Sequence, residues 1–460
     1  MAFPLRFFQH FVSTHPDIKI IIPTDHEWAD ASRQYYTSQA ARPDVITRPQ
    51  NAAHVQDLVR LCMSNNVDFV VRTGGHDCAG RSQVNHALVI DMRDIRYIKI
   101  LQDKRTAKIG GGTLIRDLAT ALGEEDLITP TVSGLVGSIG YVGWAILGGY
   151  GPLAAKYGLG VDQIIGARYV NAQGELVDAD EEALTGLRGG GGCFGVIVEL
   201  TIKVYPLKEV LMATLVFKSD DMSIAWFLFV QGYNQLLSTG SEPSCLSVQL
   251  IGKVIAGCGN MFTASVVWAD DDHDEGRKWI DVIACFGNCL RKTVRATSWQ
   301  ILCEENEKLV GSTVYGRART LNLRYLTPRT TQILAHYNSV IPGPESSISV
   351  QLIRDLGIGL KSVFEPRCQH YWLEIAGTSR DPQVAKHAEE WARSLKQDLI
   401  EKDPDNVLDA AYIGFLDDDE MELSKVYGDH YQTLVAVKRK LDPRNLFKNS
   451  VPRVEVGIED

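Results

Sequence analysis

A histidine placed directly after two glycines is the first residue of this sequence whose setting suggests chemistry. It lies in VVRTGGHDCAG, Val70 to Gly80, where an apolar run typical of a strand ends in a turn at Gly74 and Gly75. One interpretation is an ordinary turn with His76 on the surface. The other is a backbone cradle for a charged group, with His76 directed at its ligand, because such turns can present successive N–H groups to an anion.

Three further glycine-rich segments follow, at 110–112, 134–151 and 189–192. Glycine at this density weakens helices and strands, and the usual reason for it is close approach of the backbone to a ligand. Four such turns suit a long ligand such as a dinucleotide. The stretch Gly190 to Gly195 fits the pattern G-x-G-x-x-G, but strand-like VIVELTIKVY follows it where a Rossmann fingerprint requires a helix. A nicotinamide-binding Rossmann domain is therefore disfavoured.

The composition restricts the class of protein. With 45% apolar residues, 23% charged residues and a net charge of -10, the 460-residue chain is typical of two or three globular domains and untypical of nucleic-acid or membrane binding. Nine scattered cysteines form neither a disulfide framework nor a metal site, and the acidic run Asp270 to Gly276 lacks the spacing of a calcium loop. No signal peptide or spanning segment is recognised, so we expect a cytoplasmic protein without a metal.

Periodicity predicts the elements that must position His76. Residues 53–65 have the apolar spacing of a helix, 68–72, 87–93 and 106–112 resemble strands, and 113–125 is helical. A hairpin is expected around 171–174, followed by a strand at 196–205. From about 207 to 405, helices at 222–237, 272–286 and 382–401 alternate with strands such as HYWLEIAG, which suggests an antiparallel sheet covered by helices. The last fifty residues are expected to form a strand, a helix and a closing turn. The predicted fold class is α+β.

Several of these segments, taken together, resemble a known family. RTGGHDCAG, ALVIDMRDIRYIKI, IGGG, LGGYGPLAAKYGLGVDQIIGARYVNAQGELV and LRGGGGCFGVIVELTIKVY occur in the order typical of the PCMH-type FAD-binding domain of the vanillyl-alcohol-oxidase superfamily. Within that superfamily the chain is most similar to berberine-bridge-enzyme-like and 6-hydroxy-D-nicotine-oxidase-like flavoproteins. YIGFLDDDE and VYGDHYQTLVAVKRKLDPRNLF resemble the closing segment of that family. The resemblance covers about 38–206 and 405–450, whereas the middle matches only in layout.

The resemblance implies a domain division and a cofactor. A two-part FAD-binding domain would span 1–206, with its core at about 38–206. A substrate-binding domain would span 207–405, and 406–460 would return to the FAD-binding domain. FAD would be attached through its 8α-methyl group to His76, with the N–H groups of 73–77 around its pyrophosphate. The implied cofactor-binding residues are Arg72, Thr73, Gly74, Gly75, His76, Asp77, Gly80, Ser133, Gly137, Gly140, Gly143, Gly149, Ile197 and Asn445.

Three positions depart from the family pattern. Val136 stands where members with two covalent links carry a cysteine, so a second, cysteinyl link is not expected. Cys193 and His430 replace two asparagines that lie near the flavin in relatives, which would alter the polarity around its ring system.

The family also implies the reaction, an FAD-dependent oxidation. A hydride would leave a carbon of a small hydrophobic alcohol, amine or enol, in secondary metabolism, and dioxygen would take the electrons. A base would accept the accompanying proton. Alternation on HYWLEI places His370, Trp372 and Glu374 on one face of a strand and Tyr371 on the other. The candidates for the base are Lys361, His370, Tyr371, Glu374 and Tyr412, although a satisfied sheet residue or a solvated charge also explains each of them. The alternative function is a redox-neutral cyclase with structural FAD.

Overall fold

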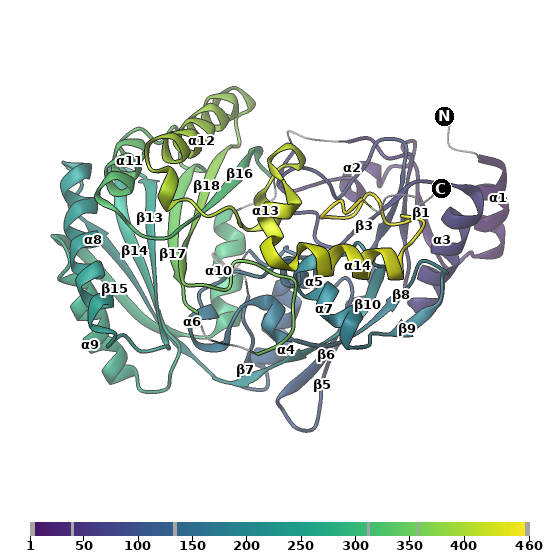
Figure 1. Ribbon diagram of the computed structural model, residues 1–460, viewed down its shortest axis with the longest axis horizontal. Helices are drawn as coiled ribbons and strands as arrows, with labels where there is room; N and C mark the ends of the chain where they lie inside the picture. Colours follow the sequence, from purple (N-terminus) through teal and green to yellow (C-terminus); the bar gives the residue numbers. More distant parts are fainter. Residues whose placement is uncertain are drawn as a thin grey trace.

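The computed structural model describes residues 5–37, 41–131, 136–310, 313–355, 357 and 359–455. Two parts lie side by side, with a large sheet and its helices on the left of Figure 1 and two smaller sheets on the right. The C-terminal segment crosses from the left part to the right one, where α1 also lies. None of the helices in the described part of the chain is long and apolar enough to cross a membrane.

The right-hand part contains a four-stranded and a five-stranded sheet. The first has the order β1-β2-β4-β3, with β1 (Lys19–Ile21) antiparallel and β2 (Val45–Arg48), β4 (Leu88–Asp91) and β3 (Phe69–Arg72) parallel. The second, fully antiparallel sheet consists of β5 (Ile98–Ile100), β6 (Thr106–Gly110), β10 (Val196–Lys203), β8 (Ile164–Val170) and β9 (Leu176–Asp178). A pair of short strands, β7 (Leu127–Ile128) and β11 (Tyr205–Pro206), lies beside them.

Helix α3 (Ala52–Asn65) joins the two sheets. Asn51 caps its first turn by accepting a hydrogen bond from the His54 N–H, and an apolar stripe that includes Val55 and Cys62 is buried. This stripe packs with residues of both sheets, among them Ile90 and Val198. The other helices of this part are α1 (Leu5–Thr14), α2 (Trp28–Ala31), α4 (Ile115–Gly123), α5 (Tyr141–Ile146), α6 (Ala154–Tyr157), α7 (Glu181–Gly190), α13 (Leu423–Tyr427) and α14 (Tyr431–Leu441).

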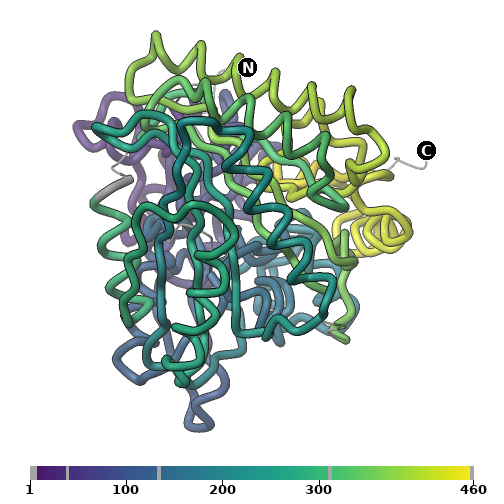
Figure 2. The backbone as a smooth tube through the Cα atoms, turned by 90° about the vertical axis from the view of Figure 1, so that its left-hand side faces the viewer, coloured from purple at the N-terminus to yellow at the C-terminus, as the bar shows by residue number. Residues whose placement is uncertain are grey.

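The left-hand part is one antiparallel sheet of seven strands. Its order is β15 (Cys289–Thr297), β12 (Val210–Phe217), β14 (Gly259–Trp268), β13 (Leu246–Ile255), β17 (Ser347–Ile353), β18 (His370–Ser379) and β16 (Tyr315–Leu323). Helices α8 (Met222–Thr239), α9 (His273–Ala284), α11 (Pro328–Ser339) and α12 (Pro382–Lys402) cover its outer face, as Figure 2 shows from the left. Helix α10 (Trp299–Val310) packs instead against α4 of the other part.

This architecture confirms the predicted fold class, with mixed helices and sheets and an antiparallel sheet covered by helices. The division at 206 and 405 stays a prediction, since the largest apolar core includes residues of both parts, such as Tyr150 and Trp372. One expectation was wrong. The segment YIGF forms a 3₁₀ turn at Ile413–Phe415 rather than a strand, because the chain there wraps over the cavity described below and pairs with no sheet.

Candidate functional site

A cavity lies where the two parts meet. Its walls come from the loop after β3, from the segment around α5, from the end of α7, from β18 and from two C-terminal segments. The residues that line it include Phe69, Thr73, Gly74, Gly75, His76, Asp77, Arg81, Met92, Gly111, Gly140, Gly143, Trp144, Tyr150, Gly192, Ile197, Trp372, Tyr412, Phe415, Phe447, Asn449 and Val451. The same cavity therefore contacts the predicted cofactor residues and the large sheet.

The loop after β3 approaches the start of α5 so closely that both need glycine. A Cβ atom on Gly74 would lie 2.3 Å from the Gly140 backbone nitrogen, and one on Gly140 would lie 2.3 Å from Thr73 Oγ1. Gly75 has a φ of +73°, which side chains disfavour. Within the described residues, the backbone N–H groups of 74–77 donate to no protein acceptor. The loop therefore presents unused donors at the cavity, which is the arrangement that a pyrophosphate requires.

His76 is held on two sides. Its Nε2 lies 2.8 Å from Ser138 Oγ, and its ring stacks on Tyr35 with centroids 4.5 Å apart and an interplanar angle of 20°. Burial, followed by the charge of Arg72, lowers the pKa of His76 to about 3. The imidazole is therefore neutral at physiological pH. Because Ser138 occupies Nε2, Nδ1 is the nitrogen left for a bond to a ligand.

Arg72 does not line the cavity but packs against Gly75 of this loop. Its guanidinium donates to the carbonyl of Ala31 at 2.6 Å and also to that of Arg33, and it lies against Gly75. Burial lowers its pKa to about 10, so it remains charged. The segment that it holds leads directly to Tyr35, whose N–H donates to the Gly75 carbonyl at 3.0 Å. Arg72 thus positions the ring that covers His76.

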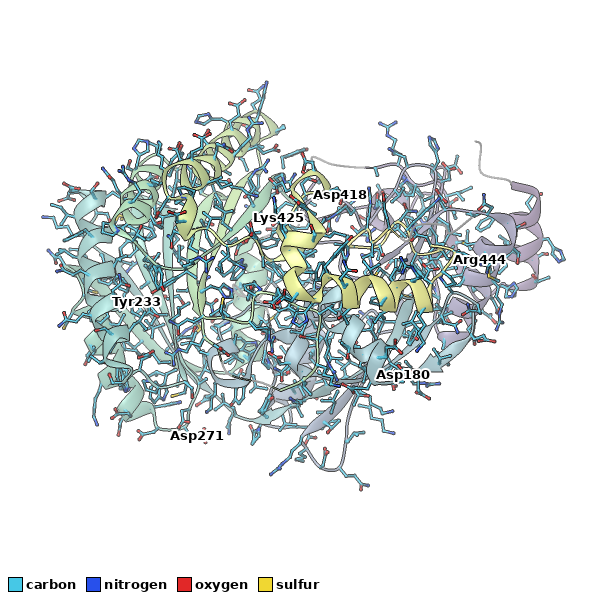
Figure 3. The ribbon with its side chains drawn as sticks, in the orientation of Figure 1. Asp180, Tyr233, Asp271, Asp418, Lys425 and Arg444 are labelled. Carbon is cyan, nitrogen blue, oxygen red and sulfur yellow. The ribbon has the colours of Figure 1, made fainter. Side chains whose placement is uncertain are left out.

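Asp77 organises the turn that follows. Its carboxylate accepts hydrogen bonds from the Ala79 and Arg81 N–H groups and from the Arg81 guanidinium, at 2.9 to 3.2 Å. Arg81 is 5% exposed and also lies 3.4 Å from Asp418, which Figure 3 labels in the C-terminal segment. This ion pair fastens the histidine loop to the segment that carries Tyr412 and Phe415 into the cavity.

The predicted cofactor residues divide into three groups. Eight of them line the cavity: Thr73, Gly74, Gly75, His76, Asp77, Gly140, Gly143 and Ile197. Five lie outside its lining: Arg72, Gly80, Gly137, Gly149 and Asn445. Gly80 completes the turn closed by Asp77, and Gly149 packs on Gly160. Ser133 lies outside the described residues.

At Asn445, the C-terminal turn differs from the expectation. Asn445 has a φ of +50° and closes the turn after α14, whereas Phe447, Asn449 and Val451 reach the cavity. Asn449 donates to the Phe69 carbonyl at 3.1 Å and so ties the turn to β3. The turn is anchored by the fully buried pair Lys438–Asp442, at 2.6 Å. The sequence motif D-P-R-N-L-F pointed to the correct turn but not to its contacting residues.

The residues at the sheet end of the cavity follow the predicted alternation. Trp372 lines the cavity, and Tyr371 packs on the opposite face with the covering helices. Glu374 lies two residues from Trp372 on the same strand face, outside the cavity lining. Its side chain is partly buried, and this burial raises its pKa to about 7. Among the described residues, no side chain donates a hydrogen bond to the Glu374 carboxylate, and none forms an ion pair with it. Glu374 can therefore exchange a proton near neutral pH.

The other base candidates have different places. Tyr412 lines the cavity, and burial raises its pKa well above the usual value. His370 lies behind Tyr150, whose hydroxyl is 2.8 Å from its Nε2. Lys361 is exposed at a second cavity and does not line the first one. The structure thus places Tyr412 in the wall of the cavity and Glu374 outside the lining, on the strand face of Trp372. It connects His370 to the cavity through Tyr150 and leaves Tyr371 and Lys361 away from it.

The two substituted family positions also lie away from the lining. Cys193 is fully buried, and its thiol donates to the Gly190 carbonyl at 3.1 Å, as expected for a packed residue. His430 pairs with Glu365 at 3.2 Å beside the second cavity. Neither exchange changes the polarity of the first cavity directly. Conversely, sequence analysis missed Tyr35, Ser138, Tyr150 and Asn449, which no local motif distinguishes.

Comparisons with known proteins agree with this site. The chain matches the family described as FAD binding domain over residues 43–180 and that described as Berberine and berberine like over 411–452. It is 30% identical over 440 residues, 94% of this chain and 85% of the relative, to the FAD-linked oxidoreductase aurO of Gibberella zeae.

Two solved structures share the fold. The 6-hydroxy-D-nicotine oxidase of Arthrobacter nicotinovorans superposes with a TM-score of 0.82 at 21% identity, covering 95% of this chain and 97% of the other. The glucooligosaccharide oxidase of Acremonium strictum, whose FAD is described as 6-S-cysteinyl, 8α-N1-histidyl, superposes with a TM-score of 0.78 at 17% identity, covering 95% and 97%. With the glycine cradle, the unused backbone donors and His76 in one cavity, these matches lead to one conclusion: the chain belongs to the berberine-bridge-enzyme-like family of FAD-linked oxidoreductases.

Proposed function

We propose that this protein is an FAD-dependent oxidase in which FAD is attached covalently through His76. FAD, when bound, supplies an acceptor for the hydride that leaves the substrate carbon, and dioxygen is the proposed final acceptor of the electrons. The substrate is a small hydrophobic alcohol, amine or enol. The observation that carries the proposal is the neutral His76, with Nδ1 unoccupied, in a glycine cradle at a cavity that also contacts the large sheet.

The residues present fit this cofactor. Backbone donors at 74–77 suit the two phosphates, and Gly111, Ile197 and Phe447 give the right-hand part of the cavity an uncharged lining for rings. Nδ1 of His76 would carry the single link, since Val136 offers no thiol for a second one. The A. strictum oxidase, with its histidyl and cysteinyl links, supports the histidyl part of this assignment only.

Glu374 would accept the proton released from the substrate. A carboxylate with a pKa near 7 combines a substantial ionised fraction at neutral pH with useful basicity. Tyr35, Tyr36 and Tyr412 are close enough for the charge of Glu374 to raise the pKa of each hydroxyl. The aromatic surfaces of Trp372, Tyr412 and Phe415 would exclude water and orient an apolar substrate.

The attachment is tested by precipitating the purified protein with acid and recording the visible spectrum and intact mass of the pellet. Yellow colour and the mass of FAD in the pellet are expected for the unchanged protein, and both should be absent from His76→Ala. His86→Ala, which alters an exposed histidine away from the cavity, is the matched control. Colour released to the supernatant would contradict the covalent link, whereas a colourless protein would contradict both the FAD-dependent oxidase and the redox-neutral cyclase with structural FAD.

A further inference from the structure

Four buried polar side chains gather behind the ring of Trp372. Asn322 on β16 and Gln351 on β17 lie directly opposite Trp372 in the register of the sheet, and His370 precedes it by two residues on β18. The fourth is Tyr150, whose ring lines the cavity and stacks on Trp372 with centroids 5.1 Å apart. Each of these side chains is 0 or 1% exposed. We call Tyr150, His370, Asn322 and Gln351 the acceptor cluster, because their hydrogen bonds with one another and with the backbone leave acceptor oxygens unused.

The hydrogen bonds of His370 fix the direction of the one that Tyr150 makes. Nδ1 of His370 lies 2.7 Å from the Cys368 carbonyl, which can only accept, so Nδ1 carries the proton. Burial lowers the pKa of His370 to about 4, which leaves Nε2 without a proton at neutral pH. Tyr150 must therefore donate its hydroxyl proton to Nε2, at 2.8 Å. Toward any other group the Tyr150 oxygen acts as an acceptor.

The two amides leave further acceptors unused. Asn322 Nδ2 donates to the Tyr150 oxygen at 3.3 Å and to the Ala410 carbonyl at 3.0 Å, and Gln351 Nε2 donates to the Gly151 carbonyl at 2.9 Å. These carbonyl partners fix the orientation of both amides. Asn322 Oδ1 and Gln351 Oε1 are buried and accept no hydrogen bond from any described residue. Buried acceptors without donors are unfavourable, so their presence next to Tyr150 and Trp372, which line the cavity, indicates a missing donor.

We propose that the acceptor cluster is a specificity site that binds a free hydroxyl or N–H group on an aromatic substrate, away from the carbon that is oxidised. This inference rests on the proposed function and adds to it the substrate class. Trp372, Tyr412 and Phe415 provide ring contacts at this end of the cavity. The cluster accepts hydrogen bonds, so it favours a phenol over its methyl ether, which has no proton to donate.

Equilibrium binding to the purified holoprotein tests this. Calorimetric titration with 2-naphthol and with 2-methoxynaphthalene compares two ligands that differ only by the methyl group on oxygen. We expect 2-naphthol to bind roughly 10-fold more tightly or better, the usual effect of leaving a buried hydrogen-bonding site without its partner. Tyr150→Phe removes only the hydroxyl and should reduce the ratio of the two affinities several-fold.

Two more variants make the result specific. Gln351→Met removes one unused acceptor without touching Tyr150, and should also reduce the ratio, so the test survives if Tyr150→Phe does not fold. Glu374→Gln should leave the ratio unchanged while impairing oxidation. Equal affinities in the unchanged protein, or binding of neither compound, would overturn the inference and indicate that water fills the cluster. So would a ratio that depends on Glu374 alone. Calorimetry reports binding whether or not oxidation follows, which separates this outcome from failure of the proposed oxidase.

Discussion

Tyr35 covers the imidazole of His76 in a parallel stack, 4.5 Å between ring centroids, although the two lie 41 positions apart in the chain. The backbone of Tyr35 bridges the two parts of the molecule: its N–H donates to Gly75, and its carbonyl accepts from the Val314 N–H at 2.8 Å. The residue that orients the histidine is thus itself positioned by the start of β16. The proposed attachment of FAD at His76 would therefore be coupled to the docking of the large sheet.

Replacing Tyr35 by Leu should weaken this coupling. Loss of the aromatic pair is expected to lower the free energy of unfolding by about 1 kcal/mol. The wider rotational freedom of His76 should also slow covalent attachment of FAD. The fraction of protein that keeps its colour after acid precipitation, followed over time from apoprotein and added FAD, measures the effect. Tyr35→Phe keeps the ring and should behave like the unchanged protein, and an equal loss in both variants would contradict a stacking role.

Glu374 should impose the acidic limb of the pH profile. Its carboxyl must be ionised to accept a proton, so the rate of flavin reduction by substrate should rise with pH and reach half its maximum near pH 7. Glu374→Gln should lower that rate by about 10²–10⁴-fold and abolish this limb. Anaerobic stopped-flow measurements between pH 5 and 9 give both values. A limb that persists in the glutamine variant would assign the titration to another group.

Stability should respond to pH in opposite directions at Glu374 and His76. The pKa of Glu374 is raised to about 7 in the folded state, above its ordinary value in the unfolded state. Between these two pH values the folded state binds more protons than the unfolded state. The contribution of Glu374 to stability is therefore present at low pH and is lost as the pH rises through 7. His76 has a lowered pKa, about 3, and its contribution is lost as pH falls below 6.5. Urea unfolding at several pH values should show the first effect disappear in Glu374→Gln. The same slope in both proteins would disprove the burial of that charge.

The buried pair Lys438–Asp442 should be essential to the C-terminal turn. Asp442 accepts the Leu446 and Phe447 N–H groups, at 2.8 and 2.9 Å, and Lys438 also donates to the Cys193 carbonyl at 2.8 Å. Lys438→Met leaves a buried carboxylate without its cation and should cost about 3–5 kcal/mol in unfolding free energy. Lys440→Met, which removes an exposed pair with Glu182, should cost less than about 1 kcal/mol. Similar losses in both variants would argue against a special role for the buried pair.

How far the sequence predicts this site depends on whether a residue belongs to a local pattern. The alternation of β18 correctly separated Trp372 from Tyr371, because strand geometry alone determines the two faces. The motif around His76 and the glycines beside it likewise located the cavity. Strands β12, β15 and β16 of the large sheet were not identified. In the exposed edge strand β15, charged residues such as Arg291 and Lys292 stand in place of an apolar pattern.

The residues that sequence analysis missed are those that tertiary contacts bring to the site. Tyr35 reaches His76 through its pairing with Val314, and Tyr150 meets His370 across 220 residues. No periodicity of either segment contains that information. Lys361 shows the reverse error: it is close to β18 in sequence, but the loop that carries it turns toward the second cavity.

The cavity is complete only after the C-terminal segment has been synthesised. Tyr412, Phe415 and Asn449 are among its walls, and Asp418 fastens their segment to Arg81 and, at 2.9 Å, to Arg453. These residues follow the glycine cradle and His76 by more than 300 positions, so a ribosome synthesises them much later. The nascent chain therefore carries an open half-site, and a chain that stops before Tyr412 lacks these walls of the cavity even when its preceding residues fold.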